Sequence, residues 1–341
     1  MLSTLFIASA ALLGAAAAAP AHHDGHTQTV FEFPNNSFIE NLAVRSNGQI
    51  LVTALTSREL VLVDPRRAGD SVLVHEFTEA NALTGIAEYE PDVFAVITGD
   101  YHFMTPNLGA GTWALWSVDM RGVKVENGGL VPAPKISKIK HVPESQLFNG
   151  ISVLSRKDKT LLVGDSKAGV IYRVNAKTGD YQVVINCTYT SPLNTPHGVN
   201  GLHIRGDTLY FANSGQFQIF KVPIHEDGTA AGQFTAVAKA QRPMEVYDDF
   251  TLDCEGNIFT STGGANSIVK VSPDGKRQVV VAGSLNSTDV AEPTAATFGR
   301  GQFDKDVLYV TTAGGSAIPV NGHIIIPGKL LAIKTHSRKC Y

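Results

Sequence analysis

The hydrophobic positions of this chain come in short runs that alternate with turn residues. In the clearest stretch, residues 196–224, the triplets Arg205-Gly206-Asp207 and Asn213-Ser214-Gly215 separate three apolar runs. Turns this frequent prevent a 3.6-residue apolar stripe from building up, whereas they suit antiparallel β-strands. The stretch therefore predicts consecutive strands joined by tight turns.

The same pattern recurs along the chain at a spacing of about 45–50 residues, which is the length of one four-stranded propeller blade. The copies begin near Ile39, Leu83, Phe148, Pro196, Tyr247 and Thr294. We therefore predict an all-β fold, a six-bladed β-propeller of four-stranded antiparallel blades spanning residues 29–336. The alternating segment Thr29–Phe33 is expected to join the last blade and close the ring, which removes an open sheet edge.

The segments outside the propeller indicate a secreted protein. Residues 1–19 are apolar and end in small residues, which is typical of a signal peptide. Residues 20–28 are expected to be a flexible mature N-terminus and residues 337–341 a tail. Three Asn-X-Ser/Thr triplets predict glycosylation at Asn35, Asn186 and Asn286. The secretory pathway or the extracellular space is the expected location.

Charge and cysteine content narrow the range of partners. The net charge is −3 and no basic block occurs, so nucleic acid is not an expected partner. No segment after the signal peptide is long enough to cross a membrane, and we expect a monomer. The cysteines are Cys187, Cys254 and Cys340, which allow one disulfide and leave one thiol over. The sequence does not fix the pairing, although a bridge to Cys340 would staple the last segment.

Blade two contains a long insertion, Asp100–Trp116, that is rich in large apolar groups. One interpretation places Phe103, Trp113 and Trp116 as an apolar lip over a mouth of the central channel, where they would bind substrate. The alternative is that residues 113–118 form the third strand of the blade, with the aromatic rings buried between blades.

Polar residues stand at matching positions near the start of the clear copies: Glu40, Asn149, Asn200 and Asp248. Innermost strands of a propeller converge on its axis, so we expect these side chains to meet around one point. Carboxylate and amide oxygens are hard ligands that suit Ca²⁺ or another divalent cation at the channel mouth. The alternative is strand-end capping without a metal.

This pattern resembles the senescence-marker-protein, gluconolactonase and luciferin-regenerating-enzyme superfamily and its paraoxonase and phosphotriesterase-like relatives. The motifs that carry the resemblance are IENLAV, LFNGISV, GVNGLHI and YDDFTLD. It implies that Glu40, Asn149, Asn200 and Asp248 are metal ligands, with Asp249 as an extra ligand position. The resemblance spans nearly the whole mature chain.

Two departures from the sugar-lactone members of that superfamily stand out. Those members carry an Arg two residues before the first Asn and an Asp directly after it, where this chain has Leu147 and Gly150. Loss of both polar groups favours an apolar, flat ligand, with Leu147 among the substrate-binding residues. The His-His dyad of the paraoxonase-like enzymes has no match, although His102 and His197 lie near blade mouths.

The signal peptide, the propeller and the lost sugar contacts together resemble one further group, the secreted fungal hetero-Diels–Alderases of tropolone–sesquiterpenoid pathways. A cycloaddition of this type needs no cofactor and no nucleophile; it needs two apolar partners held in a reactive pose. The resemblance implies a small apolar organic substrate in the channel. The candidates for donating a hydrogen bond to a substrate carbonyl are Asn149, Asn200, Tyr247 and His197.

Two other hypotheses remain open at this stage. The first is a Ca²⁺-dependent lactonase or esterase, in which the cation polarises the carbonyl that is attacked. The second is a non-catalytic propeller that binds small apolar ligands. Neither a GxSxG elbow nor a phosphate-cradling glycine loop occurs in the sequence.

Overall fold

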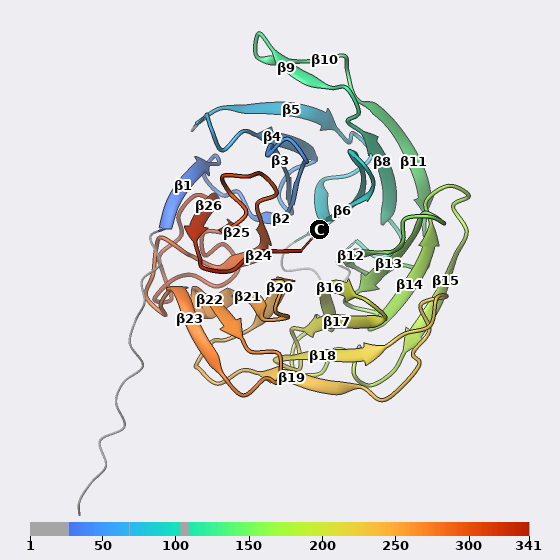
Figure 1. Cartoon of the computed structure of the whole chain (residues 1–341), viewed down its shortest axis with the longest axis vertical. Coiled ribbons are helices and arrows are strands. Elements are labelled where there is room, and N and C mark those ends of the chain that lie inside the picture. The colour runs from blue at the N-terminus through green and yellow to red at the C-terminus, as the bar shows by residue number, and fades with distance from the viewer. Residues whose placement is uncertain (1–26, 68, 103–108, 341) are drawn as a thin grey trace, which may run out of the picture.

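The computed structural model describes residues 27–67, 69–102 and 109–340, which form a ring of six four-stranded antiparallel sheets (Figure 1). Each sheet is one blade, so the prediction of an all-β six-bladed propeller is confirmed. Within these ranges the helical structure is a single 3-10 turn, η1 (Gly263–Ala265). The predicted signal peptide, residues 1–19, lies outside the described residues.

Each blade contributes one strand to the ring axis. The six innermost strands are β2 (Ile39–Val44), β6 (Ala82–Glu90), β12 (Phe148–Ser155), β16 (Val199–Arg205), β20 (Tyr247–Leu252) and β24 (Pro293–Phe298). They contact one another in chain order around the axis, and β24 contacts β2 to complete the circle. We call the end of the axial channel where these strands begin the N-terminal mouth, and the opposite end the C-terminal mouth.

The remaining strands stack outward from the axis. The second strands are β3 (Ile50–Ala54), β7 (Val93–Gly99), β13 (Thr160–Asp165), β17 (Thr208–Asn213), β21 (Ile258–Thr262) and β25 (Val307–Thr312). The third strands are β4 (Glu59–Val63), β8 (Ala114–Asp119), β14 (Val170–Asn175), β18 (Gln218–Pro223), β22 (Ser267–Val271) and β26 (Lys329–Lys334). The outermost strands are β5 (Ser71–Glu76), β11 (Lys135–His141), β15 (Tyr181–Asn186), β19 (Thr235–Lys239), β23 (Gln278–Gly283) and β1 (Thr27–Glu32). A small hairpin, β9 (Lys124–Glu126) and β10 (Gly129–Val131), precedes β11.

The ring closes through strands from the two ends of the chain. Strand β1 pairs antiparallel with β26, from Thr27 opposite Ile333 to Glu32 opposite Lys329. It therefore supplies the outermost strand of the last blade, as the sequence predicts. The strand begins at Thr27 rather than Thr29, so the last two residues of the segment expected to be flexible are already paired. This pairing covers an edge that would otherwise expose free backbone groups.

Apolar side chains fill the spaces between neighbouring blades. Phe259 of β21 and Phe298 of β24, for example, lie edge to face across the boundary of blades five and six, with ring centroids 5.2 Å apart. Both rings are essentially unexposed. Aromatic and branched residues therefore fill the boundaries between neighbouring blades.

Each innermost strand opens with the same irregularity in its pairing. The register against the second strand shifts, for example between Phe148 and Ile151 in β12 and between Val199 and Leu202 in β16. Such a bulge turns two successive residues toward the axis. The backbones then approach so closely that a Cβ on Gly150 would lie 2.2 Å from the carbonyl oxygen of Asn200.

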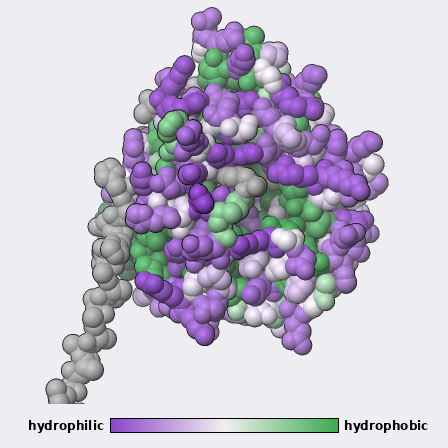
Figure 2. Space-filling view, viewed as in Figure 1, coloured by the Kyte–Doolittle hydropathy of each residue, from purple (hydrophilic) through white to green (hydrophobic). Residues whose placement is uncertain are grey.

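The outer surface is mainly hydrophilic. Figure 2 shows that polar residues cover most of the face seen in Figure 1, with smaller apolar patches between them. Among the described residues, no helix is long and apolar enough to cross a membrane.

Candidate functional site

Four polar side chains, called here the axial set, meet at the N-terminal mouth: Glu40, Asn149, Asn200 and Asp248. Each is the second residue of its innermost strand. A side-chain hydrogen bond joins Asn149 to Glu40, and another joins Asn200 to Asp248. Glu40, Asn149 and Asn200 are each less than a tenth exposed. The structure thus brings together all four residues that the sequence pattern placed on one axis.

Threonines stand at the corresponding pairing irregularity in the two remaining blades, Thr84 as the third residue of β6 and Thr294 as the second of β24. The Thr84 hydroxyl of β6 donates to the carbonyl oxygen of Phe148 at 3.0 Å, and the Thr294 hydroxyl of β24 donates to that of Ile39 at 2.7 Å. Both hydroxyls are therefore used to join one blade to the next. Sequence analysis did not single out these threonines, because the repeat pattern is weakest in their two blades.

The carboxyl groups of the axial set have raised pKa values. Burial, together with the nearby carboxylates of Asp249 and Glu292, raises the pKa of Glu40 from 4.5 to about 8. Burial and the charge of Glu40 raise the pKa of Asp248 well above its ordinary value. Two carboxylates close together in a poorly solvated site cannot both ionise without cost. At neutral pH, with no cation nearby, Glu40 therefore keeps its proton and can donate a hydrogen bond.

A third acidic group, Glu292, lies on the loop before β24. Its carboxylate oxygens accept hydrogen bonds from the backbone N–H groups of Ala317 and Ile318, each at 3.0 Å. Burial nevertheless raises the pKa of Glu292 to about 7. Glu292 therefore adds to the negative charge around Glu40 and anchors the loop between β25 and β26.

The axial set has the oxygen atoms that a hard divalent cation needs. The Asn200 amide nitrogen donates to the Ser214 hydroxyl at 3.0 Å, whereas its amide oxygen is buried without a hydrogen-bond partner among the described residues. A buried oxygen of this kind and two mutually repelling carboxylates fit Ca²⁺ coordination. In ranges 27–67, 69–102 and 109–340, the axial set included, no three His, Cys, Asp or Glu side chains are arranged to hold a metal, so a cation here would also need the amide oxygens.

Asp249 faces a different set of partners from its neighbour Asp248. Its carboxylate accepts from the Asn41 amide of β2 at 2.8 Å and from the backbone N–H of Phe250 at 2.7 Å, and lies 2.9 Å from His203 Nε2 of β16. The sequence motif had suggested an extra metal ligand here. The structure instead places Asp249 in a hydrogen-bond network that crosses the channel.

His203 is a candidate functional residue that the sequence analysis missed. It stands two residues after Gly201 in β16, so it points to the same side of the strand, toward the axis. Its ring also packs edge to face on Phe250, with centroids 4.7 Å apart. The alternation of side chains along the strand was the signal that could have identified it.

A cavity of about 480 Å³ lies on the C-terminal side of this network. Its wall is formed by the later residues of the innermost strands and by two residues of the C-terminal tail. Charged and titratable side chains in this wall include Glu88, Arg156, His203, Arg205, Arg300 and Lys339. Burial, and then the charge of Arg300, lower the pKa of Lys339.

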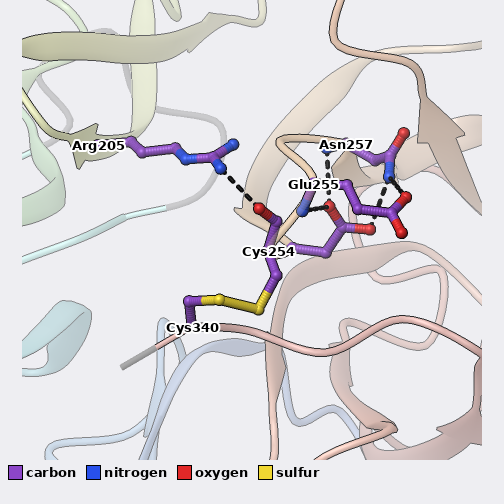
Figure 3. Close-up of a disulfide and its surroundings, with 6 residues drawn as sticks. Arg205, Cys254, Glu255, Asn257 and Cys340 are labelled. Atoms are coloured by element: carbon purple, nitrogen blue, oxygen red, sulfur yellow. Dashed lines mark hydrogen bonds between the residues drawn. A yellow bond between two sulfur atoms is a disulfide. The ribbon is translucent and has the colours of Figure 1, made fainter.

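A disulfide fixes the C-terminal tail to blade five. Cys254, on the turn after β20, is bonded to Cys340, and the backbone N–H of Cys254 donates to the Arg338 carbonyl at 2.8 Å (Figure 3). In Figure 1 the C-terminus accordingly lies at the centre of the ring. The sequence left the pairing open, and the structure selects the bridge to Cys340. Cys187 is the free, partly buried thiol.

Apolar groups surround the N-terminal mouth. Tyr101 packs on a small cluster that includes Phe38 and Leu55, and burial together with the charge of Glu40 raises its pKa to about 12. Loops at this end also carry exposed large apolar residues, namely Leu193, Met244, Leu285 and Ile325. The mouth therefore has an apolar rim, although different residues form it from those predicted. Phe103 lies outside the described residues.

The tryptophans and Leu147 do not line the channel, which corrects the sequence prediction. Trp113 is fully buried between blades two and three, against Gly99. Trp116 lies on the third strand β8, where its indole N–H donates to the Thr98 hydroxyl at 3.0 Å and its ring packs on Phe77. Leu147 is 2% exposed in the same core as Trp113. These residues precede a bulge or lie on outer strands, so they face neighbouring blades.

Two of the predicted hydrogen-bond donors are also directed elsewhere. Tyr247 is fully buried, and its hydroxyl donates to the Gln278 side chain of β23 at 3.0 Å, away from the axis. The prediction that Tyr247 donates a hydrogen bond to the substrate is therefore wrong. His197 lies partly buried on the loop before β16, and burial lowers its pKa, so its ring is neutral at pH 7. No described contact joins its ring to the axial set.

Comparison with known proteins finds relatives that share the propeller fold. The family model described as the SMP-30/Gluconolactonase/LRE-like region matches residues 164–314. The resemblance to this superfamily is confirmed. Luciferin-regenerating enzyme shares the fold, with a TM-score of 0.65 and 14% identity over 92% of this chain and 97% of that one.

Two fungal relatives match most of the chain. "Putative hetero-Diels-Alderase asR5" of Sarocladium schorii is 26% identical over 91% of this chain and 83% of its own length. A "Putative hetero-Diels-Alderase" of a Phoma species is 27% identical over 82% of this chain and 84% of its own length. The names of both relatives are those of enzymes, and both alignments span most of the propeller.

Proposed function

We propose that this protein is an enzyme of hetero-Diels–Alderase type that acts on a small apolar natural product at the N-terminal mouth of its channel. The observation that carries the proposal is the axial set itself: buried amide and carboxyl groups gathered beside an apolar rim. The two fungal relatives with this name support it.

The proposed chemistry depends on binding and orientation. A cycloaddition between an oxygen-containing diene and an alkene needs the two partners aligned within van der Waals contact, and correct alignment can supply about 7 kcal/mol or more of the barrier. Exposed apolar side chains on the loops of this mouth, such as Leu193 and Met244, provide a wall for hydrocarbon partners, because binding there removes apolar surface from water.

The axial set supplies the polar part of the reaction. Negative charge develops on the carbonyl oxygen of the diene as the new bonds form, and fixed hydrogen-bond donors stabilise it. The amide of Asn149, which also bonds to Glu40, is a donor of this kind. The N–H groups of Asn200 bond to Ser214 and Asp248, so Asn200 offers its amide oxygen and not a donor. Glu40 acts as a further donor, because its raised pKa keeps the proton on its carboxyl group at neutral pH. No proton needs to leave the enzyme during the reaction.

The test is to incubate the purified protein with a tropolone quinone methide and a humulene-type alkene. We expect faster product formation than in buffer and an excess of one stereoisomer, measured by chiral chromatography. An unchanged rate and an unchanged isomer ratio would contradict the proposal.

A second candidate function rests on the buried, unpartnered amide oxygen of Asn200. If Glu40, Asn149, Asn200 and Asp248 hold Ca²⁺, the cation would supply a Lewis acid that polarises a lactone or ester carbonyl. Metal analysis and a panel of aryl esters and lactones test this function. Undiminished turnover in Asp248→Ala would exclude it.

We also propose that the protein passes through the secretory pathway. Asn35, Asn186 and Asn286 are all exposed, and the bridge between Cys254 and Cys340 suits an oxidising compartment. Treatment of the natively produced protein with an N-glycosidase should increase its electrophoretic mobility. Unchanged mobility would show that these three sites carry no glycan.

A further inference from the structure

The cavity at the C-terminal mouth differs chemically from the N-terminal mouth. Four cationic side chains line it: Arg156, Arg205, Arg300 and Lys339. They come from blade three, blade four, blade six and the tail, so they surround the cavity rather than form one surface stripe. Such convergence of positive charge within a cavity is typical of an anion-binding site.

The carboxylates in the same wall do not balance this charge. Asp253 accepts hydrogen bonds from the backbone N–H groups of Glu255 and Asn257, at 3.0 and 2.8 Å, and from the Asn257 amide at 2.7 Å. It also lies 3.8 Å from Lys270. Figure 3 shows Glu255 and Asn257 on this turn. These bonds hold the Asp253 carboxylate on its own turn, while its negative charge still counts in the wall.

Three carboxylates, those of Glu88, Asp249 and Asp253, face the four cations. Glu88 lies 2.7 Å from Arg300 and 3.9 Å from Arg156, so one carboxylate is shared by two guanidinium groups. Asp249 is bonded to Asn41 and His203, and its charge also favours the charged form of Lys339. The described residues that line the cavity therefore leave it with an excess of positive charge.

The tail brings Lys339 into this wall. The disulfide holds Cys340 to Cys254, and the Lys270 ammonium donates to the Ser337 hydroxyl at 3.0 Å, so both sides of Lys339 are fixed. Arg205 donates to the Cys254 carbonyl at 2.7 Å, which ties the same turn to blade four (Figure 3). The positive charges of Arg300 and Arg156 oppose that of Lys339. An anion bound between these groups would relieve that repulsion.

We propose that this cavity binds a small organic dianion, a dicarboxylate or a phosphate ester, with the disulfide-held tail as part of the binding wall. Guanidinium groups match the paired oxygens of both anions in a bidentate manner, and the volume of about 480 Å³ admits a ligand larger than an inorganic ion. The site lies at the opposite end of the channel from the axial set. It is therefore independent of the proposed cycloaddition.

Isothermal titration calorimetry with succinate and with glycerol 3-phosphate tests the proposal, at constant ionic strength and after dialysis into a metal-free buffer without other polyanions. We expect at least one probe to bind and the uncharged succinamide not to bind. Binding of succinate alone assigns a carboxylate ligand, and binding of glycerol 3-phosphate alone assigns a phosphate ester.

Matched variants locate the binding. Arg156→Gln and Lys339→Gln should each weaken binding at least tenfold, whereas the exposed Arg277→Gln and Lys334→Gln should leave it unchanged. The Arg156 side chain is 57% exposed, so its variant is expected to fold, which circular dichroism checks. Absence of binding by both probes, or equal binding by Arg156→Gln, Lys339→Gln and the native protein, would overturn the proposal.

Discussion

Asn41 and Asp249 are joined by a 2.8 Å hydrogen bond across the propeller axis, although 208 residues separate them in the sequence. Asn41 belongs to blade one and Asp249 to blade five, so the bond connects blades that are not neighbours in the ring. The pair lies between the axial set at the N-terminal mouth and the cationic cavity at the C-terminal mouth. It therefore divides the channel into two chemically different ends.

Replacement of Asn41 by Leu should destabilise the fold by about 1–3 kcal/mol, because it leaves a buried carboxylate without one of its donors. Urea unfolding followed by circular dichroism measures the change. Gln182→Leu on β15 is the control, since Gln182 is exposed and its replacement should stay within about 0.5 kcal/mol. Equal stability of the two variants would show that the bond across the axis adds little.

Gly150→Ala should be strongly destabilising, by about 2 kcal/mol or more, because its Cβ would lie 2.2 Å from the Asn200 carbonyl oxygen. Gly129→Ala is the control, since a Cβ there would come no closer than 3.8 Å to another residue. Thermal unfolding compares the two variants. A melting temperature in Gly150→Ala equal to the control's would mean that the innermost strands can move apart.

Asn149→Leu should lower the cycloaddition rate by about 10²-fold, since it removes a donor at the reacting oxygen. Tyr247→Phe should change the rate less than twofold, because the Tyr247 hydroxyl bonds to Gln278 away from the channel. Single-turnover product formation measures both. A large loss in Tyr247→Phe with little loss in Asn149→Leu would place the reaction outside the axial set.

The stability of the cation-free protein should fall as the pH rises from about 4.5 to about 8. Over this range the folded protein still holds protons on Glu40 and Glu292, whose pKa values are about 8 and about 7, whereas the unfolded chain has lost them. Their contribution is thus most favourable below pH 4.5 and is lost progressively up to pH 8. Urea unfolding in EDTA measures this slope.

Glu40→Gln should flatten that slope, while the exposed Glu59→Gln on β4 should leave it as in the native protein. Added Ca²⁺ should raise the stability at pH 8 if the axial set binds it, because only the ionised carboxylates are good ligands. A native slope that Glu40→Gln does not alter would contradict the raised pKa of this residue.

Replacement of both Cys254 and Cys340 by Ser should lower the free energy of unfolding by about 2–5 kcal/mol, because the bridge closes a long loop in the unfolded chain. Cys187→Ser is the matched control, since that thiol is free. Guanidinium unfolding compares the variants. If the double variant matched Cys187→Ser, the tail would contribute nothing to global stability.

Much of the site was predictable because each innermost strand repeats the same local pattern. Glu40, Asn149, Asn200 and Asp248 occupy the second position of their strands, and a closed ring brings second positions together. Leu147 and Tyr247 were misplaced because they lie within two residues of these positions in the sequence, before the bulge of their strand. Side chains before the bulge face the neighbouring blade, and the sequence does not mark where the bulge begins.

The sequence by itself determined the number of blades, the closure of the ring by strands from both ends of the chain, and the polar residues at the strand starts. These follow from local turn chemistry and from a repeat length, which need no knowledge of distant contacts. Only the tertiary structure decided that His203 meets Asp249, that Cys254 pairs with Cys340, and that the tail joins the wall of the cationic cavity. Each of these contacts joins residues far apart in the chain, and their proximity depends on the curvature of the whole ring.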